Sequence, residues 1–411
     1  MNRPTQLPAG KRAYLLKLVQ DVRASYWFLP SILVFVGLTL AFFMGWIDAR
    51  GTRLPFPLPE TLLDTQADGA RSTLAVIAQS IIGVTGVMFS MTLVAVSFAS
   101  GNFGPRLIGN FMRDRGNQWS LGILISTFVY ALVVLRSVQD GIDGGVAEYV
   151  PQYSLIMALI LTLLCVFTLI YFIHHVPETI NVSRISAGIG AALEKQILDL
   201  IERDNDSDNG TRHPNRDPDT VITSAVSGYV QTVNFDQLSE LAMASDWHVA
   251  LNVPLGGFVT SKTPVISVWG KDLSDDDHRH ILGCFAVGSG RTENQNPSFL
   301  AEQLVEMVAR ALSPGLNDPY TAIDCLNRMA AALTIAGTYR DGLRPPSVAR
   351  VTFHHLTFAR LLEVTFGKCR PYVLDDPLTL QHAQALLDEL HETVRDTDKG
   401  AVADMREALK G

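Results

Sequence analysis

Residues 73–99 contain no charged side chain and are long enough to cross a lipid bilayer as one helix, since the hydrocarbon core needs about 20 apolar residues. Along this segment small and polar residues recur at spacings of four, three, four and seven, which place them on one stripe of an α-helix. The stripe consists of Gln79, Gly83, Gly86, Ser90 and Ser97. Small and hydroxyl-bearing residues let another helix approach closely and form hydrogen bonds where water is absent. The pattern therefore predicts a membrane helix that either lines a pathway or packs at the centre of a bundle.

Three further apolar segments have the length of membrane spans, at residues 27–47, 119–135 and 155–173. Lysine and arginine are enriched on the cytoplasmic side of membrane spans. Residues 1–26 carry five of them against one acid, and Arg106, Arg113 and Arg115 follow the second span. The loops after the first and third spans are acidic or mixed in charge. We therefore expect a four-span domain over residues 27–176 with both termini in the cytoplasm. The flank 1–26 is either a short surface helix or simply a basic segment.

The chain after residue 176 has the pattern of a soluble α+β domain. Pro177 is expected to end the fourth span, because proline removes a backbone donor and clashes with the preceding turn. Short β-branched runs punctuated by Gly and Pro then predict a small β-sandwich-like module, and amphipathic patterns predict a helical subdomain at the C-terminus. A helix at 178–203 and a linker are expected over residues 177–219, and the β-rich module over 220–290, with a short helix at 236–244. The helical subdomain is expected over 291–411. Its helices are predicted to begin at Asn296 and at Asp318 and to cover residues 348–366 and 377–394.

Composition excludes several classes of protein. The net charge of −8 gives no support for a nucleic-acid-binding surface, which needs clustered basic residues. The four cysteines are far apart and form no CxxC pair, which indicates free thiols in a reducing compartment. The sequence contains no motif for a phosphate-binding loop, a nucleophile elbow, an HExxH zinc site or a dinucleotide-binding turn. We therefore predict no enzymatic activity and no cofactor.

Three histidine-containing segments invite a metal interpretation: the adjacent pairs His174–His175 and His354–His355, and an acidic run followed by two histidines. His174 and His175 are adjacent, so on a helix they point about 100° apart and cannot converge on one ion as an i, i+4 pair does. The run Asp275–Asp276–Asp277, followed by His278 and His280, could bind a cation but is typical of a solvated turn before a strand at Ile281. The sequence therefore predicts no metal site.

Several longer segments carry a family resemblance. These are GVTGVMFSMTLVAVSFASGNFGPRLIGNFMRDR, FIHHV, SGYVQTVNFDQL and GRTENQNPSFLAEQLVEMVARALSPGLNDPYTA. Together they resemble an uncharacterised bacterial family of predicted membrane proteins, domain of unknown function 2254. The resemblance covers nearly the whole chain and implies a bacterial inner-membrane protein with a four-span N-terminal half and a cytosolic C-terminal half. It supplies no activity and no catalytic residue. Asn296 departs from the acid expected there.

Residues 227–270 also resemble a biotinyl-lipoyl-type β-sandwich, through SGYV, PLGGFV and TPVISV. Such a module would carry its cofactor on a lysine at a hairpin tip, and no lysine occupies the matching position. Only the fold is therefore expected to be shared, which says little about function.

The segment SPGLNDP has two interpretations. Its residues are Ser313, Pro314, Gly315, Asn317, Asp318 and Pro319 around Leu316. Backbone donors at the start of a helix suit an anion, so the segment could be a binding loop. Alternatively, it is a corner in which Gly315 ends one helix and Asp318 caps the next. The negative charge of Asp318 would repel an anion and therefore favours the corner.

The sequence supports two hypotheses of function. The first is a homo-oligomeric channel or transport-type protein for an inorganic ion. In it the stripe lines the pathway, Arg106, Arg113 and Arg115 form the cytoplasmic mouth, and the cytosolic domain assembles or gates the complex. The stripe lacks an acid or base, which argues against proton-coupled pumping. The alternative is a membrane-anchored scaffold or signalling protein acting through its cytosolic domain. Expected partners are the bilayer and further copies of the chain.

Overall fold

The computed structural model describes residues 25–50, 65–104, 114–139, 149–202, 214–270, 273–293, 295–339, 343 and 348–410. The described part divides into two units. The bundle unit comprises the described residues up to Gly101 and from Asp114 to Asn181, and the C-terminal unit comprises those from Val182 on together with Asn102–Gly104. Most of the predicted flank 1–26 and of the linkers lies outside the described residues.

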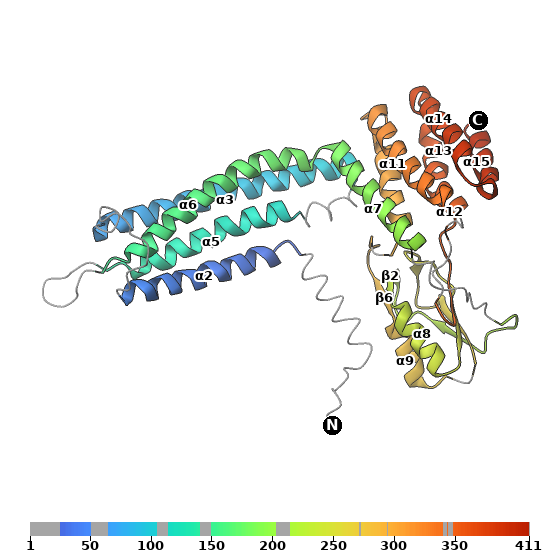
Figure 1. Cartoon of the computed structure of the whole chain (residues 1–411), viewed down its shortest axis with the longest axis horizontal. Coiled ribbons are helices and arrows are strands. Elements are labelled where there is room, and N and C mark those ends of the chain that lie inside the picture. The colour runs from blue at the N-terminus through green and yellow to red at the C-terminus, as the bar shows by residue number, and fades with distance from the viewer. Residues whose placement is uncertain are drawn as a thin grey trace. The chain divides into compact units, whose positions relative to one another are not determined.

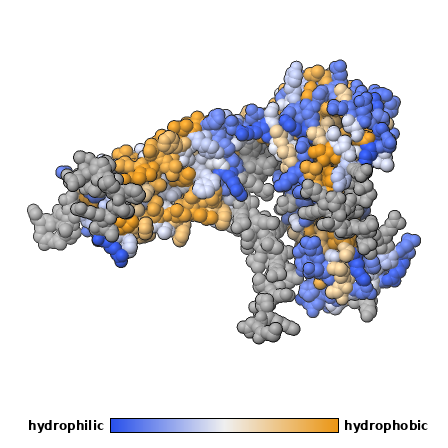
Figure 2. All heavy atoms as spheres, in the orientation of Figure 1, coloured by the Kyte–Doolittle hydropathy of each residue, from blue (hydrophilic) through white to orange (hydrophobic). Residues whose placement is uncertain are grey.

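The bundle unit contains four long apolar helices (Figure 1), as the sequence predicted: α2 (Phe28–Ala49), α3 (Ala67–Phe103), α5 (Arg115–Ser137) and α6 (Gln152–Thr179). Each is long and apolar enough to cross a membrane. Figure 2 shows apolar surface gathered over these helices, as expected for side chains that meet lipid rather than water.

Helix α5 packs against both α2 and α6. The contact with α2 is close because glycines lie in it: a Cβ atom at Gly37 would lie 2.5 Å from Ser126 Oγ, and one at Gly122 would lie 2.4 Å from Leu33 Cδ1. Small residues at such contacts let membrane helices approach closely. The centre of the bundle is filled by fully buried side chains, including Leu74, Leu124, Tyr130 and Ala158.

The C-terminal unit begins with a β-rich module made of two sheets. The four-stranded sheet has the order β1-β5-β3-β7, and the three-stranded sheet has the order β4-β2-β6. All strand pairs are antiparallel except β3 with β7. The strands are β1 (Thr220–Thr223), β2 (Gly228–Val233), β3 (His248–Leu251), β4 (Phe258–Val259), β5 (Pro264–Trp269), β6 (Phe285–Gly288) and β7 (Val351–Thr352). Their inward residues form one core with α8 (Phe235–Ala244) and α9 (Asp275–Gly283), including Ile222, Val230, Leu238, Ile266 and Ile281.

Helices make up the rest of the C-terminal unit. Helix α7 (Val182–Glu202) packs on α10 (Pro297–Ala311) and α11 (Pro319–Thr338), and α11 also packs on α14 (Pro377–Thr393). A continuous helical run comprises α12 (Phe358–Leu362), a π-helical turn η4 (Glu363–Gly367) and α13 (Lys368–Val373). The last helix is α15 (Asp396–Ala408).

Three expectations about local structure were wrong, and one helix was not predicted. Pro177 lies inside α6, which ends at Thr179, so the next helix starts at Val182 rather than at residue 178. The acidic run at Asp275 begins helix α9, and Ile281 lies in that helix rather than in a strand. Residues 348–366 are not one helix, because Val351 and Thr352 pair with β3 and the helix begins only at Phe358. Helix α15 was missed.

Candidate functional site

The stripe on α3 faces away from the bundle unit. Gln79, Gly83, Gly86, Ser90 and Ser97 are all exposed in the single chain. A Cβ atom at Gly83 or Gly86 would meet nothing within 4 Å. The face therefore has room for a neighbouring helix or for water, and no other described part of the chain fills it.

The opposite face of α3 is the one that packs into the bundle. From Leu74 onward its buried residues are Leu74, Ile77, Ala78, Ile81, Thr85, Met88, Thr92 and Ala99. The two threonines bond to their own helix, Thr85 to the Ile81 carbonyl (2.6 Å) and Thr92 to the Met88 carbonyl (3.0 Å). Both hydroxyls on the inward face thus have hydrogen-bond partners. The predicted stripe lies about half a turn around the helix from this face.

Only part of the predicted cytoplasmic mouth can be located. Arg115 is exposed in the first turn of α5, directly after the capping residue Asp114. Arg106 and Arg113 lie outside the described residues. A cluster of the three arginines therefore stays a prediction.

The SPGLNDP segment forms the corner between α10 and α11. Asp318 caps α11, accepting hydrogen bonds from the Thr321 backbone amide (3.1 Å) and hydroxyl (2.5 Å), and Pro319 occupies the first turn. Asn317 adopts a left-handed conformation with φ of 47°. Pro314, Gly315 and Asn317 are exposed, and Ser313 Oγ bonds to the Arg310 carbonyl (2.6 Å). The carboxylate of Asp318 occupies the position that an anion would take at this helix start.

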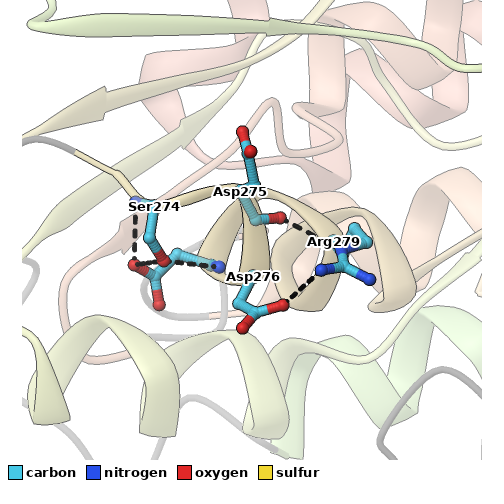
Figure 3. Close-up of polar contacts among 5 residues, drawn as sticks. Ser274, Asp275, Asp276 and Arg279 are labelled. Atoms are coloured by element: carbon cyan, nitrogen blue, oxygen red, sulfur yellow. Dashed lines mark hydrogen bonds and ion pairs between the residues drawn. The ribbon is translucent and has the colours of Figure 1, made fainter.

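The acidic run before His278 forms the first turn of α9 (Figure 3). Ser274 and Asp277 form a capping box, and Asp276 pairs with Arg279. Hydrogen bonds from the Ser274 side chain, and then from its backbone amide, lower the pKa of Asp277. These carboxylates thus stabilise a helix terminus. Among the described residues, no group of three or more His, Cys, Asp or Glu side chains could hold a metal ion.

The two adjacent histidines at the end of α6 have different environments. His174 has 82% of its side chain exposed and lies 3.4 Å from Glu178, as expected for a residue at a membrane interface. His175 has 19% exposed, and its Nε2 lies 2.6 Å from Asp114 Oδ2. Sequence reasoning missed this pair because its members are distant in the chain.

A second cluster that the sequence did not reveal lies in the GRTENQNP segment. Arg291 donates to the Gly256 carbonyl (3.0 Å), pairs with Glu302 of α10 and stands 5.6 Å from the Tyr229 ring centroid. Glu302 also binds Lys368 of α13 at 2.5 Å. These contacts join the three-stranded sheet to two helices, so the segment is a structural junction within the C-terminal unit.

Asn296 belongs to the same junction. It is buried, and its side chain accepts a hydrogen bond from the Phe299 amide (3.1 Å) and so caps α10. Asn and Asp cap helices about equally well. The absence of an acid at this position therefore leaves the cap intact and removes one buried charge.

All four cysteines are free and buried. Burial raises the pKa of Cys284 to about 12 and also raises the pKa values of Cys325 and Cys369. Because the thiolate is the reactive form, we expect maleimide at pH 8 to label these three thiols about 10³-fold more slowly in native than in unfolded protein. Mass spectrometry after timed labelling measures this ratio. Equal labelling rates would show that these thiols are accessible in the native protein.

Comparison with known proteins agrees with the membrane architecture. The family model described as predicted membrane protein (DUF2254) matches residues 23–389. Uncharacterised proteins of Mycobacterium bovis and Mycobacterium tuberculosis are each 28% identical over 407 residues, covering 95% of this chain and 76% of the relative. No solved structure matches the chain.

Proposed function

The chain belongs to the DUF2254 family of predicted membrane proteins, and from this premise we propose that it is a homo-oligomeric channel or transport-type protein for an inorganic ion. The observation that carries the proposal is the outward direction of the α3 stripe. In this proposal the C-terminal unit assembles or gates the complex.

A polar stripe facing lipid is unfavourable. Gln79 and Ser97 are 18 residues apart, which is about 27 Å along a helix and close to the roughly 30 Å thickness of the hydrocarbon core. The amide of Gln79 has no hydrogen-bond partner available in lipid tails, and each such group costs free energy there. Protein or water is therefore expected to cover the stripe.

A second copy of the chain provides that cover most simply. Four helices of one chain enclose little water, and the buried face of α3 is already used for packing. Copies arranged around an axis would bring their stripes together. Gly83, Gly86 and Ser90 would then allow close helix approach or line a narrow pathway with hydroxyls and backbone carbonyls.

The orientation of the bundle is part of the proposal. The distribution of Lys and Arg favours both termini in the cytoplasm of a bacterial inner membrane. We expect reporter fusions after Asp64 and Asp143 to give periplasmic signals, and fusions after Arg115 and Arg212 to give cytoplasmic signals. The reverse assignment at any of the four positions would contradict this topology.

Conduction is tested on full-length protein in liposomes. Ser90→Cys places a thiol on the stripe, and Met91→Cys places a control thiol at the same depth, about 100° around the helix. The native cysteines are buried, so an aqueous thiosulfonate reagent reports on the added thiol. We expect the reagent to modify Ser90→Cys and change its ion flux, and to leave Met91→Cys unaffected.

Charge replacement provides the second readout. A carboxylate in a narrow pathway favours cations, so Ser90→Asp should raise the ratio of cation to anion flux, and Gln79→Leu should lower flux. A folded oligomer that shows no flux under voltage, osmotic shock or pH steps would contradict conduction. That result would favour the membrane-anchored scaffold, and capture of partners by its cytosolic domain would then be the next experiment.

A further inference from the structure

The corner between α10 and α11 displays two large apolar side chains that the described part of the chain leaves uncovered. Leu316 is 44% exposed, and Tyr320, in the first turn of α11, is 74% exposed. We call these two residues the apolar tip. Hydrogen bonds from the Leu316 and Asn317 amides to the Ser313 carbonyl (3.1 and 2.9 Å) close the corner. The backbone therefore holds the tip outward.

Helices α7 and α11 run side by side in the same direction. The Ser186 hydroxyl of α7 donates to the Asp324 carboxylate of α11. Four residues further along both helices, a Cβ atom at Gly190 would lie 3.0 Å from Arg328 Cβ. Contacts that advance by one turn on both helices require the helices to be parallel. The start of α7 therefore lies beside the start of α11, and so beside the apolar tip.

The chain itself connects this end of the C-terminal unit to two membrane helices. Helix α6 ends at Thr179 and α7 begins at Val182, so these two helix ends are at most about 11 Å apart. Gly104 directly follows α3 and belongs to the C-terminal unit. A Cβ atom on Gly104 would lie 2.6 Å from Oε1 of Glu306, in the last turns of α10. The end of α10 and the start of α7 therefore both lie where a membrane helix ends.

Helix α14 starts at the same end of the C-terminal unit. His382 Nε2 lies 2.7 Å from Asn327 Oδ1 of α11, and the Arg395 amide, just after α14, donates to the Gly337 carbonyl of α11 (3.0 Å). The two contacts advance together along both helices, so α14 is parallel to α11. The corner that precedes α14 therefore lies close to the level of the apolar tip.

This second corner also exposes large apolar side chains. Tyr372, in the last turn of α13, is 42% exposed, and Leu378, in the first turn of α14, is 44% exposed. Asp375 between them is exposed as well. Exposed apolar side chains gathered at one end of a domain mark an interaction surface. The short connection to α6 identifies the lipid surface as the partner within reach of this end.

We propose that this end of the C-terminal unit rests on the bilayer, with the apolar tip inserted between lipid headgroups. Tyrosine is enriched at membrane–water interfaces, where its ring leaves water and its hydroxyl stays hydrated, and leucine gains free energy by leaving water. The Asp318 carboxylate is used in its helix cap, and Asp375 stays among the headgroups, where water is available. The contact would hold the C-terminal unit against the membrane.

The test uses full-length protein in nanodiscs of phosphatidylcholine and phosphatidylglycerol. Leu316→Cys, labelled with an environment-sensitive fluorophore, reports on the tip, because the native cysteines are buried. Leu198→Cys is the matched control: Leu198 is 43% exposed and lies about 24 Å along α7 from its start. Lipids spin-labelled high in the acyl chain should quench the Leu316→Cys label about threefold more than the control, because inserted side chains reach the boundary between headgroups and acyl chains.

A measurement on wild-type protein avoids any effect of the label. In hydroxyl-radical footprinting of the same nanodiscs, we expect Tyr320 to be oxidised more slowly than Phe258 of β4. The single chain exposes Tyr320 more than Phe258 (74% against 59%), so the opposite order is expected if the tip faces water.

The proposal is wrong if lipid quenches both labels equally, or if Tyr320 reacts faster than Phe258. Protection of Tyr320 without quenching of the Leu316→Cys label would indicate that protein, such as a second copy of the chain, covers the tip, and would equally overturn the proposal. Neither measurement requires ion flux, so the outcome is independent of whether α3 lines a pathway.

Discussion

Gly37→Val is expected to destabilise the bundle unit by about 3 kcal/mol, because overpacking of a close contact forces the backbones apart. The added Cβ atom would lie 2.5 Å from Ser126 Oγ and 2.8 Å from the Ser126 carbonyl oxygen. The hydroxyl can rotate away, but the carbonyl is part of α5 and can move only with the helix. Denaturation in mixed micelles, followed by tryptophan fluorescence, to which Trp27, Trp46 and Trp119 of the bundle unit contribute, measures the loss.

Gly45 provides the matched control on the same helix. A Cβ atom there would meet nothing within 4 Å, and alanine is favoured over glycine inside a helix by roughly 0.5–1 kcal/mol. Gly45→Ala should therefore unfold at the same denaturant concentration as the wild type or slightly above it. If Gly37→Val behaved like Gly45→Ala, the close contact between α2 and α5 would be contradicted.

The four membrane helices could be predicted from sequence because length and apolarity are local properties. The stripe on α3 could also be found, since a helical period fixes which residues share a face. Whether the stripe faces into the bundle or away from it could not be predicted. Gln79 and Leu74 lie on different faces, but only packing against the other helices determines which face is buried.

The candidate sites that sequence reasoning missed depend on contacts between distant residues. Asp114 and His175 are 61 positions apart, and Glu302 and Lys368 are 66 apart. No local sequence pattern indicates either pair. The start of α9 is different, because Ser274 followed three residues later by Asp277 resembles a capping box, and this local signal was available. The acidic run resembles a solvated turn only when its charge is considered without the capping residue Ser274.

Asp48→Ala is expected to be among the most destabilising substitutions in the bundle unit. The carboxylate lies in the last turn of α2 and accepts hydrogen bonds from the Tyr153 amide (2.9 Å), the Ser154 amide (3.0 Å) and the Ser154 hydroxyl (2.6 Å). It therefore caps α6 from another helix. Alanine leaves these three donors without their charged acceptor, which we expect to cost about 3 kcal/mol.

Two further variants show whether the charge or the single bonds matter. Asp48→Asn keeps an acceptor oxygen and should lose less stability than Asp48→Ala, whereas Ser154→Ala removes one bond and should cost about 1 kcal/mol. The same micelle denaturation ranks all three. Because the α6 amides at Tyr153 and Ser154 face apolar surroundings when uncapped, Asp48→Ala should be the least stable of the three variants. Equal stability of Asp48→Ala and wild type would mean that α2 does not cap α6.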